Sequence, residues 1–344
     1  MVQERATWPG CKFLVALLVL SLATGAVKGQ LTYNYYATTC PNLDDLARAA
    51  FNNRVTFFNI ISLPANILRL AFHDCAVDGC EGSVLLSSTP DGSITDEKLS
   101  SKNIGIGNIP VITYMKQQID AVCNDSGAPI VSCADVVALA GREAFNFAKL
   151  AGNLPSQIIP IPLGRRDGLS AQTSHADAQL LGPETSIDQL LENFDRIGLT
   201  IEQSVALVGS HTIGIAHCVN IVPRLYPTTD ATLSSVMGLG LAAKLKLMCP
   251  ENTYSSSTVV NNDPSNTVFD SVYFANVMAG QGLMGIDDNL RLDNRTSGFA
   301  QNFALNPLYF YEIFAQAYGV LTSWRALTGN EGQIRTDCTQ VNSY

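Results

Sequence analysis

The stretch "ILRLAFHDCAVDGCEGSVLL", from Ile67 to Leu86, contains the residues that best indicate the fold. Arg69 and His73 are four residues apart, so in a helix they share one face, although their neighbours are apolar. A cation beside an imidazole suits the cleavage of an O–O bond, because the imidazole accepts a proton and the cation stabilises the charge on the leaving oxygen. The spacing also allows a plainer alternative, in which the arginine pairs with a carboxylate and the histidine is a satisfied core residue.

The loop that follows this pair is rich in oxygen donors. Cys75 and Cys80 bracket a four-residue gap, and the residues from Asp74 to Ser83 include several acidic and hydroxyl side chains. A solvated acidic turn is one interpretation of this loop. Zinc is a weaker alternative, because the chain contains no C-x-x-C pair.

The N-terminus carries an apolar run of 11 residues from Phe13 to Ala23, preceded by Arg5 and Lys12 and followed by small residues. A membrane-spanning helix needs about 20 apolar residues. The pattern therefore predicts a signal peptide at residues 1–29, cleaved from one domain at residues 30–344, with an uncleaved anchor as the alternative. It predicts secretion and no membrane partner.

Composition limits the possible partners. The chain has 344 residues, 47% of them apolar, and a net charge of -9, which argues against nucleic acid as a partner. Eight cysteines lie after residue 29, and an even number in a secreted chain predicts up to four disulfides, among 105 possible pairings. Two N-x-S/T glycosylation acceptors are present, at Asn124 and Asn294.

Apolar residues at helical spacing dominate the chain, and no convincing run of alternating strand residues is found. Ser132 with Asp135, and Thr200 with Gln203, have the spacing of capping boxes. The pattern predicts a mainly helical protein without an internal linker. Helices are expected at residues 40–58, 65–75, 111–123, 132–152, 200–209 and 307–324.

The other three histidines give weaker signals. His175 lies in a polar loop and is expected to be solvated, and His217 is expected to have a surface or packing role. His211 follows the end of a predicted helix in "VGSHTIGIAHC". It becomes a candidate metal ligand if a carboxylate orients its second nitrogen, but the sequence alone does not say which carboxylate.

Two long motifs resemble those of the class III secretory plant peroxidases. "LRLAFHDCAVDGCEGSVLL" is similar to the distal-site motif of that family, and "ALVGSHTIGIAHC" to its proximal haem-ligand motif. "DEKLSSKN", "VSCAD", "LGRRDG", "GLMGIDDNL" and "LTGNEGQIRTDC" match further family segments in order, so the resemblance extends from Gln30 to the end. It implies an all-α haem peroxidase fold, in which two helical halves enclose one haem b. It also implies the disulfides Cys40–Cys123, Cys75–Cys80, Cys133–Cys338 and Cys218–Cys249.

The resemblance implies catalytic roles on the distal side of the haem. His73 is expected to be the acid/base, and Asn103, supported by Glu97, is expected to hold its far nitrogen. Arg69 is expected to stabilise the peroxide anion. Phe72 is expected to pack over the haem and screen the iron from large substrates.

On the proximal side, the resemblance implies His211 as the iron ligand and Asp287 as the acceptor of its other N–H. It also implies two calcium ions, with the proximal one in doubt because "NNDPSNTVFD" is one residue short. Either Asn262 or Asp263 must then fill a carboxylate position. The expected ligands are Asp74, Val77, Gly79, Glu81 and Ser83 at the distal site, and Thr212, Ser265, Val268 and Asp270 at the proximal site.

The implied activity is reduction of H₂O₂ to water by a monomer, with phenolic donors oxidised in one-electron steps. Expected roles are peroxide catabolism, the oxidative stress response, and lignin or cell-wall cross-linking. A haem-binding cell-wall protein with low turnover is the alternative. An ascorbate-type intracellular peroxidase is disfavoured by the signal peptide and the cysteines.

Several positions depart from the family pattern, mostly near the substrate channel. Leu181, the expected substrate-binding residue, stands where proline is usual, and Asn220 replaces a phenylalanine. Ala76 and Glu81 replace phenylalanine and aspartate. "IGIGNIP" lacks an arginine expected near the haem rim, and "AGNLPSQ" replaces another family segment. The substrate class is therefore the least certain part of the prediction.

Overall fold

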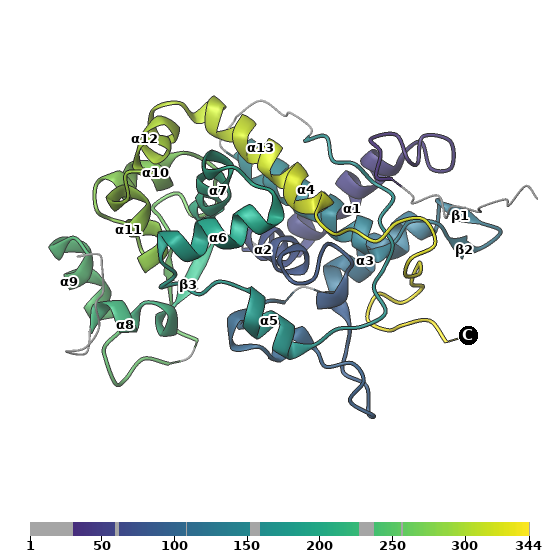
Figure 1. Ribbon diagram of the computed structural model, residues 1–344, viewed down its shortest axis with the longest axis horizontal. Coiled ribbons are helices and arrows are strands. Elements are labelled where there is room, and N and C mark those ends of the chain that lie inside the picture. The colour runs from purple at the N-terminus through teal and green to yellow at the C-terminus, as the bar shows by residue number, and fades with distance from the viewer. Residues whose placement is uncertain are drawn as a thin grey trace, which may run out of the picture.

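Helix α2 (Leu63–Ala76), which carries the arginine–histidine pair, packs along the long helix α4 (Cys133–Ala151) at the centre of the molecule (Figure 1). The computed structural model describes residues 30–58, 62–107, 109–151, 159–226, 237–255 and 257–343. The predicted signal peptide at residues 1–29 lies outside these ranges. The segment "AGNLPSQ" begins at the last residue of one range, Ala151, and otherwise lies outside them.

The remaining helices form two groups around this pair. In Figure 1, α1 and α3 lie on one side of α2 and α4, and α8 to α12 lie on the other. Helix α13 packs against α7, α2 and α12. The bounds are α1 (Leu43–Phe58), α3 (Ile109–Asp120), α5 (Thr173–Gln179), α6 (Ile187–Ile197), α7 (Ile201–Val208), α8 (Val222–Leu225), α9 (Leu239–Met248), α10 (Val272–Met278), α11 (Gly285–Leu292), α12 (Ser297–Leu305) and α13 (Pro307–Ser323).

Four short strands form two antiparallel pairs, which the sequence patterns did not predict. Strand β1 (Asn124–Asp125) pairs with β2 (Ala128–Pro129), and β3 (Ile215–His217) pairs with β4 (Val259–Asn261). Strands of two or three residues are too short for alternation to be recognised. The all-α fold class is confirmed, because these pairs add only small hairpin-like contacts to a helical protein.

One of the two predicted capping boxes is present. At α7 the Thr200 side chain accepts the Gln203 N–H, and the Gln203 side chain accepts the Thr200 N–H. At α4, Ser132 Oγ accepts the Asp135 N–H at 3.0 Å. The Asp135 side chain does not accept the Ser132 N–H in return, so the prediction of a capping box there is wrong. The Asp135 carboxylate instead accepts bonds from buried Arg165 and from the Tyr36 hydroxyl, both at 2.8 Å.

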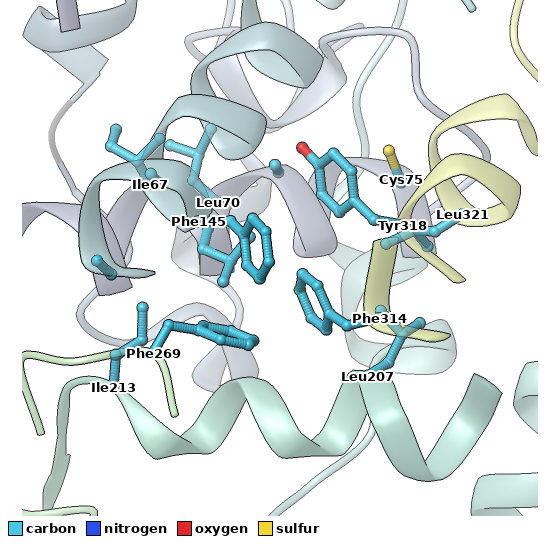
Figure 2. Close-up of a cluster of buried hydrophobic side chains, with 14 of the residues drawn as sticks. Ile67, Leu70, Cys75, Phe145, Leu207, Ile213, Phe269, Phe314, Tyr318 and Leu321 are labelled. Carbon is cyan, nitrogen blue, oxygen red and sulfur yellow. The ribbon is translucent and has the colours of Figure 1, made fainter. Parts of the chain in front are cut away.

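The core is a continuous set of aromatic and aliphatic side chains between these helices. Phe145 of α4 stacks on Phe314 of α13, with ring centroids 4.9 Å apart, and Phe269 lies 4.7 Å from Phe314 (Figure 2). Such aromatic pairs stabilise a core beyond their buried area. This cluster holds α13 against α4.

Four disulfides are present, in the pairing that the resemblance implied, and three of them join distant parts of the chain. They are Cys40–Cys123, Cys75–Cys80, Cys133–Cys338 and Cys218–Cys249. The Cys75–Cys80 bond closes the loop that follows α2. Within that loop Gly79 has φ +124°, and a Cβ there would lie 2.7 Å from the Arg325 carbonyl oxygen, so only glycine fits.

Candidate active site

His73 lies in the last turn of α2 and is buried. Its Nδ1 lies 2.6 Å from Asn103 Oδ1, and Asn103 Nδ2 donates to the Glu97 carbonyl oxygen at 2.8 Å. Because that second bond fixes the amide orientation, Oδ1 is an acceptor and His73 Nδ1 carries the proton. The lone pair is therefore on His73 Nε2. The support from Glu97 comes from its backbone carbonyl, while its carboxylate Oε2 is buried without a hydrogen-bond partner.

The environment of His73 keeps its ring neutral. Burial lowers the pKa of His73 well below its ordinary value, and the neighbouring Arg69 cation lowers it further. The hydrogen bond that His73 donates to Asn103 opposes this shift but is the smaller effect. A neutral imidazole with a free Nε2 lone pair can act as a general base.

Arg69 points from α2 toward the residues on either side of Asn103. Its Nη1 donates to the Ile104 carbonyl oxygen at 2.9 Å, and its Nη2 donates to the Lys102 carbonyl oxygen at 3.0 Å. Among the described residues no carboxylate forms an ion pair with it, so the plainer alternative of an arginine–carboxylate pair is wrong. Burial lowers the pKa of Arg69 to about 10, which leaves a cation at neutral pH.

His211 lies in the short 3-10 helix Gly209–Thr212 after α7. Its Nδ1 lies 2.8 Å from Asp287 Oδ1, and Asp287 Oδ2 accepts the Met284 N–H at 2.9 Å. A carboxylate only accepts, so His211 Nδ1 carries a proton and Nε2 has the lone pair. His211 is therefore a histidine oriented by a carboxylate, as the sequence analysis required of a metal ligand, although the residues alone did not identify the carboxylate.

Tyr273 of α10 completes this arrangement and was missed by the sequence analysis. Its hydroxyl donates to Asp287 Oδ1 at 2.9 Å, so that oxygen accepts from Tyr273 and His211 together. Burial raises the pKa of Tyr273 well above its ordinary value, and Asp287 raises it further, so the hydroxyl keeps its proton. Nothing in the spacing of these residues links them before the chain is folded.

The two histidines fit a haem group between them. His211 is close enough to His73 for its charge to contribute to the lowered pKa of His73. Each ring has its Nδ1 bound to the protein and its Nε2 available, and the His211 side chain is 35% exposed although Asp287 behind it is buried. Phe72 lies beside His73, with ring centroids 5.7 Å apart. An oriented imidazole with a free Nε2 is the donor that haem iron takes.

Comparisons with known proteins agree with this geometry. The model of a family described as peroxidase matches residues 45–306. The chain is 36% identical to Peroxidase 29 of Arabidopsis thaliana over 338 residues, covering 94% of this chain and 95% of that protein. It is 33% identical to Peroxidase 5 of Vitis vinifera over 346 residues, covering 100% of both.

The chain belongs to the class III plant peroxidases. It is therefore a peroxidase, an oxidoreductase that acts on H₂O₂ with a donor substrate. Membership of this family implies haem and calcium as cofactors. The resemblance seen in the sequence motifs is confirmed.

The distal calcium loop of this peroxidase has a donor set that suits the ion. The Asp74 carboxylate is buried, and burial raises its pKa to about 6. The pKa of Glu81 rises to about 7, through burial first and then the charge of Asp74. Ser83 Oγ is buried without a hydrogen-bond partner. A buried hydroxyl in the same loop as two carboxylates, one of which raises the pKa of the other, fits a site for a hard cation.

The proximal loop groups Asp263, rather than Asn262, with the expected ligands. Thr212 Oγ1 donates toward Asp263 Oδ2 at 3.0 Å and lies 3.3 Å from Asp270 Oδ1. Ser265 Oγ contacts both carboxylates, at 3.3 and 3.1 Å. Asn262 instead donates to the Ile213 carbonyl oxygen. The short loop therefore still brings two carboxylates and two hydroxyls together.

No group of three or more His, Cys, Asp or Glu side chains that could hold a metal is found in the described part of the chain. Each expected calcium set contains only two acidic side chains, with hydroxyl and carbonyl oxygens as the remainder. Such sets fit Ca²⁺ and do not fit zinc.

Of the two remaining histidines, one differs from its prediction. His175 is half-exposed, but its Nδ1 lies 2.5 Å from Asp78 Oδ2, so it is hydrogen-bonded rather than merely solvated. His217 lies near Arg69, because a Cβ on Gly105 would be 3.3 Å from His217 Nε2 and 3.8 Å from Arg69 Nη1. Leu181 is half-buried, and its substrate-binding role stays a prediction.

Proposed function

We propose that this peroxidase is secreted, reduces H₂O₂ to water at the His73–Arg69 pair, and takes electrons one at a time from phenolic donors. The observation that carries the proposal is the state of His73. Its Nδ1 proton is held by Asn103, its pKa is lowered, and a cation without a carboxylate partner among the described residues lies one turn away.

Haem b, held by His211, supplies the two-electron oxidising chemistry when it is bound. His73 Nε2 accepts the proton of one peroxide oxygen and returns it to the other oxygen as the O–O bond breaks. Arg69 stabilises the negative charge that develops on the leaving oxygen. One H₂O₂ and two donor hydrogens thus give two water molecules and two donor radicals. Asp287 holds His211 in one orientation and increases its electron donation.

Secretion and phenolic donors are the finer parts of this proposal. Four disulfides support an oxidising compartment, since disulfides rarely persist in the cytosol. In the described ranges no helix has the length and apolar character needed to cross a membrane. We propose the cell wall as the location, and peroxide removal with cross-linking of wall phenolics as the role. Sequencing the N-terminus of protein collected from the medium tests cleavage near residue 29.

The substitution His73→Ala tests the catalytic proposal. The variant should keep the haem Soret band, while its second-order rate constant with H₂O₂ falls by about 10²–10⁴-fold, because an acid/base group is lost. His175→Ala is the matched control, since Asp78 keeps a second hydrogen bond from Gln179 when that ring is removed. An unchanged rate in His73→Ala would favour the alternative of a haem-binding wall protein with low turnover.

A further inference from the structure

A cavity of about 900 Å³ lies between α4 and α13, away from the two active-site histidines. In Figure 1, α13 crosses in front of α4, and Figure 2 shows Phe145 of α4 in the aromatic cluster under α13. The walls of the cavity include Phe145, Tyr311, Ile159 and Trp324, and exposed side chains such as Gln316 form its rim. Ligand pockets of about 300–1,000 Å³ take molecules of drug size.

One charged group lines the inside of this cavity. Lys149, in the last turn of α4, is only 2% exposed. Its Nζ lies 5.3 Å from the ring centroid of Phe145 and 5.9 Å from that of Tyr311, so its contacts are with ring faces. Burial lowers the pKa of Lys149. Glu312 also lines the cavity, but it is exposed and forms no ion pair with Lys149.

Lys149 shares this lack of a carboxylate with Arg69 at the peroxide site, but it differs from the other buried cations in the described ranges. Each of those has an acidic partner within ion-pair distance, as a buried charge normally requires. The pairs are Lys116–Asp120, Arg142–Glu143, Arg165–Asp135, Arg224–Asp288 and Arg335–Asp167. Lys149 is therefore a buried lysine that lines a cavity large enough to admit an anion.

We propose that this cavity binds an aromatic monocarboxylate, whose carboxylate pairs with Lys149 Nζ and whose ring packs against the wall that Tyr311 and Trp324 form. Aromatic walls favour a flat aromatic body, since ring pairs are attracted beyond their buried area. A single cation matches a single negative charge. The site is separate from the peroxide site and does not depend on the proposed reaction.

Calorimetric titration of the calcium-loaded haem protein with 2-naphthoate tests this proposal. One saturable site is expected, and Lys149→Met should weaken it by about ten- to a hundredfold, because a charge-assisted bond is lost. The neutral 2-naphthamide should bind more weakly than 2-naphthoate and equally to both proteins. Lys246→Met is the matched control, since Lys246 Nζ also lies over a ring, that of Tyr226 at 5.0 Å, but on α9.

A second variant fills the cavity without removing the charge. Gly319 lines the cavity, and a Cβ on it would have no neighbour nearer than the Pro160 carbonyl oxygen at 4.0 Å, so Gly319→Leu has room to fold. It should abolish 2-naphthoate binding. The proposal is overturned if 2-naphthoate does not bind, if Lys149→Met or Gly319→Leu leaves its affinity unchanged, or if binding shifts the Soret band and so reports the haem edge.

Discussion

Tyr273→Phe isolates how the protein tunes the proximal histidine. In the native protein the Tyr273 hydroxyl and His211 Nδ1–H share Asp287 Oδ1, while Met284 N–H occupies Oδ2. Removal of the hydroxyl leaves more negative charge on the oxygen that faces His211. The N–H···O bond should then strengthen, the ring should become more like an imidazolate, and the reduction potential of a haem iron bound to it should fall.

The size of the effect follows from the strength of the bond that is removed. A hydrogen bond to a charged group contributes about 1.5–3 kcal/mol. A tenfold change in a one-electron equilibrium corresponds to about 59 mV and to about 1.4 kcal/mol. If about 1 kcal/mol of the hydrogen-bond energy becomes a difference between the two iron oxidation states, the reduction potential of the iron falls by about 40 mV. The free energy of unfolding should fall by about 1 kcal/mol, because Asp287 keeps two other donors.

Spectroelectrochemical titration of the iron measures the potential, and urea unfolding measures the stability. Tyr318→Phe is the matched control: it also removes a buried tyrosine hydroxyl, one that donates to the Ala138 carbonyl oxygen at 2.9 Å and has no contact with Asp287. Both variants should be less stable, but only Tyr273→Phe should have a lower potential. An unchanged or higher potential in Tyr273→Phe would refute the reasoning.

Three further predictions follow from individual contacts. Asn103→Val leaves His73 Nδ1 without its partner, so stopped-flow measurement should show a peroxide rate constant about 10- to 100-fold lower; an unchanged value contradicts the orienting role. Gly168→Ala places a Cβ 2.6 Å from Glu81 Cδ, so calcium retained after dialysis against a chelator should decrease, whereas equal retention removes Glu81 as a ligand. Lys149→Met should stabilise the ligand-free protein at neutral pH. Because the folded-state pKa of Lys149 is lowered, the native chain gains stability as the pH rises from that pKa toward 10.5. The difference in the free energy of unfolding between Lys149→Met and the native chain, measured in urea, should therefore shrink over that pH window. A constant difference contradicts the prediction.

The sequence could predict the features that helix geometry alone determines. Arg69 and His73 share a face of α2 because any helix places residues four apart together. The Thr200–Gln203 capping box was predictable for the same reason, since both of its bonds are local. At Ser132–Asp135 the local pattern failed because Arg165, 30 residues away, takes the carboxylate. Local pattern therefore decides a contact only where no distant buried charge competes for the same group.

Contacts that depend on tertiary folding were out of reach. Tyr273, His211 and Asp287 come from α10, the 3-10 helix after α7, and α11, and no periodicity connects them. The burial of Lys149 depends on α13 lying over the end of α4, although the spacing of apolar residues within α4 was clear. The choice of Asp263 over Asn262 likewise depends on how the short loop returns to Thr212.

The two active-site histidines show how one side chain acquires two chemistries from its partner. Both have Nδ1 bonded to an oxygen, at 2.6 Å in His73 and 2.8 Å in His211. The acceptor of His73 is a neutral amide, which fixes the tautomer but adds no charge, so burial and Arg69 keep that ring an uncharged base. The acceptor of His211 is a carboxylate, which increases electron donation from the opposite nitrogen. In the roles that we propose, the difference between proton transfer at His73 and iron ligation at His211 therefore lies in the oxygen behind each ring rather than in the rings themselves.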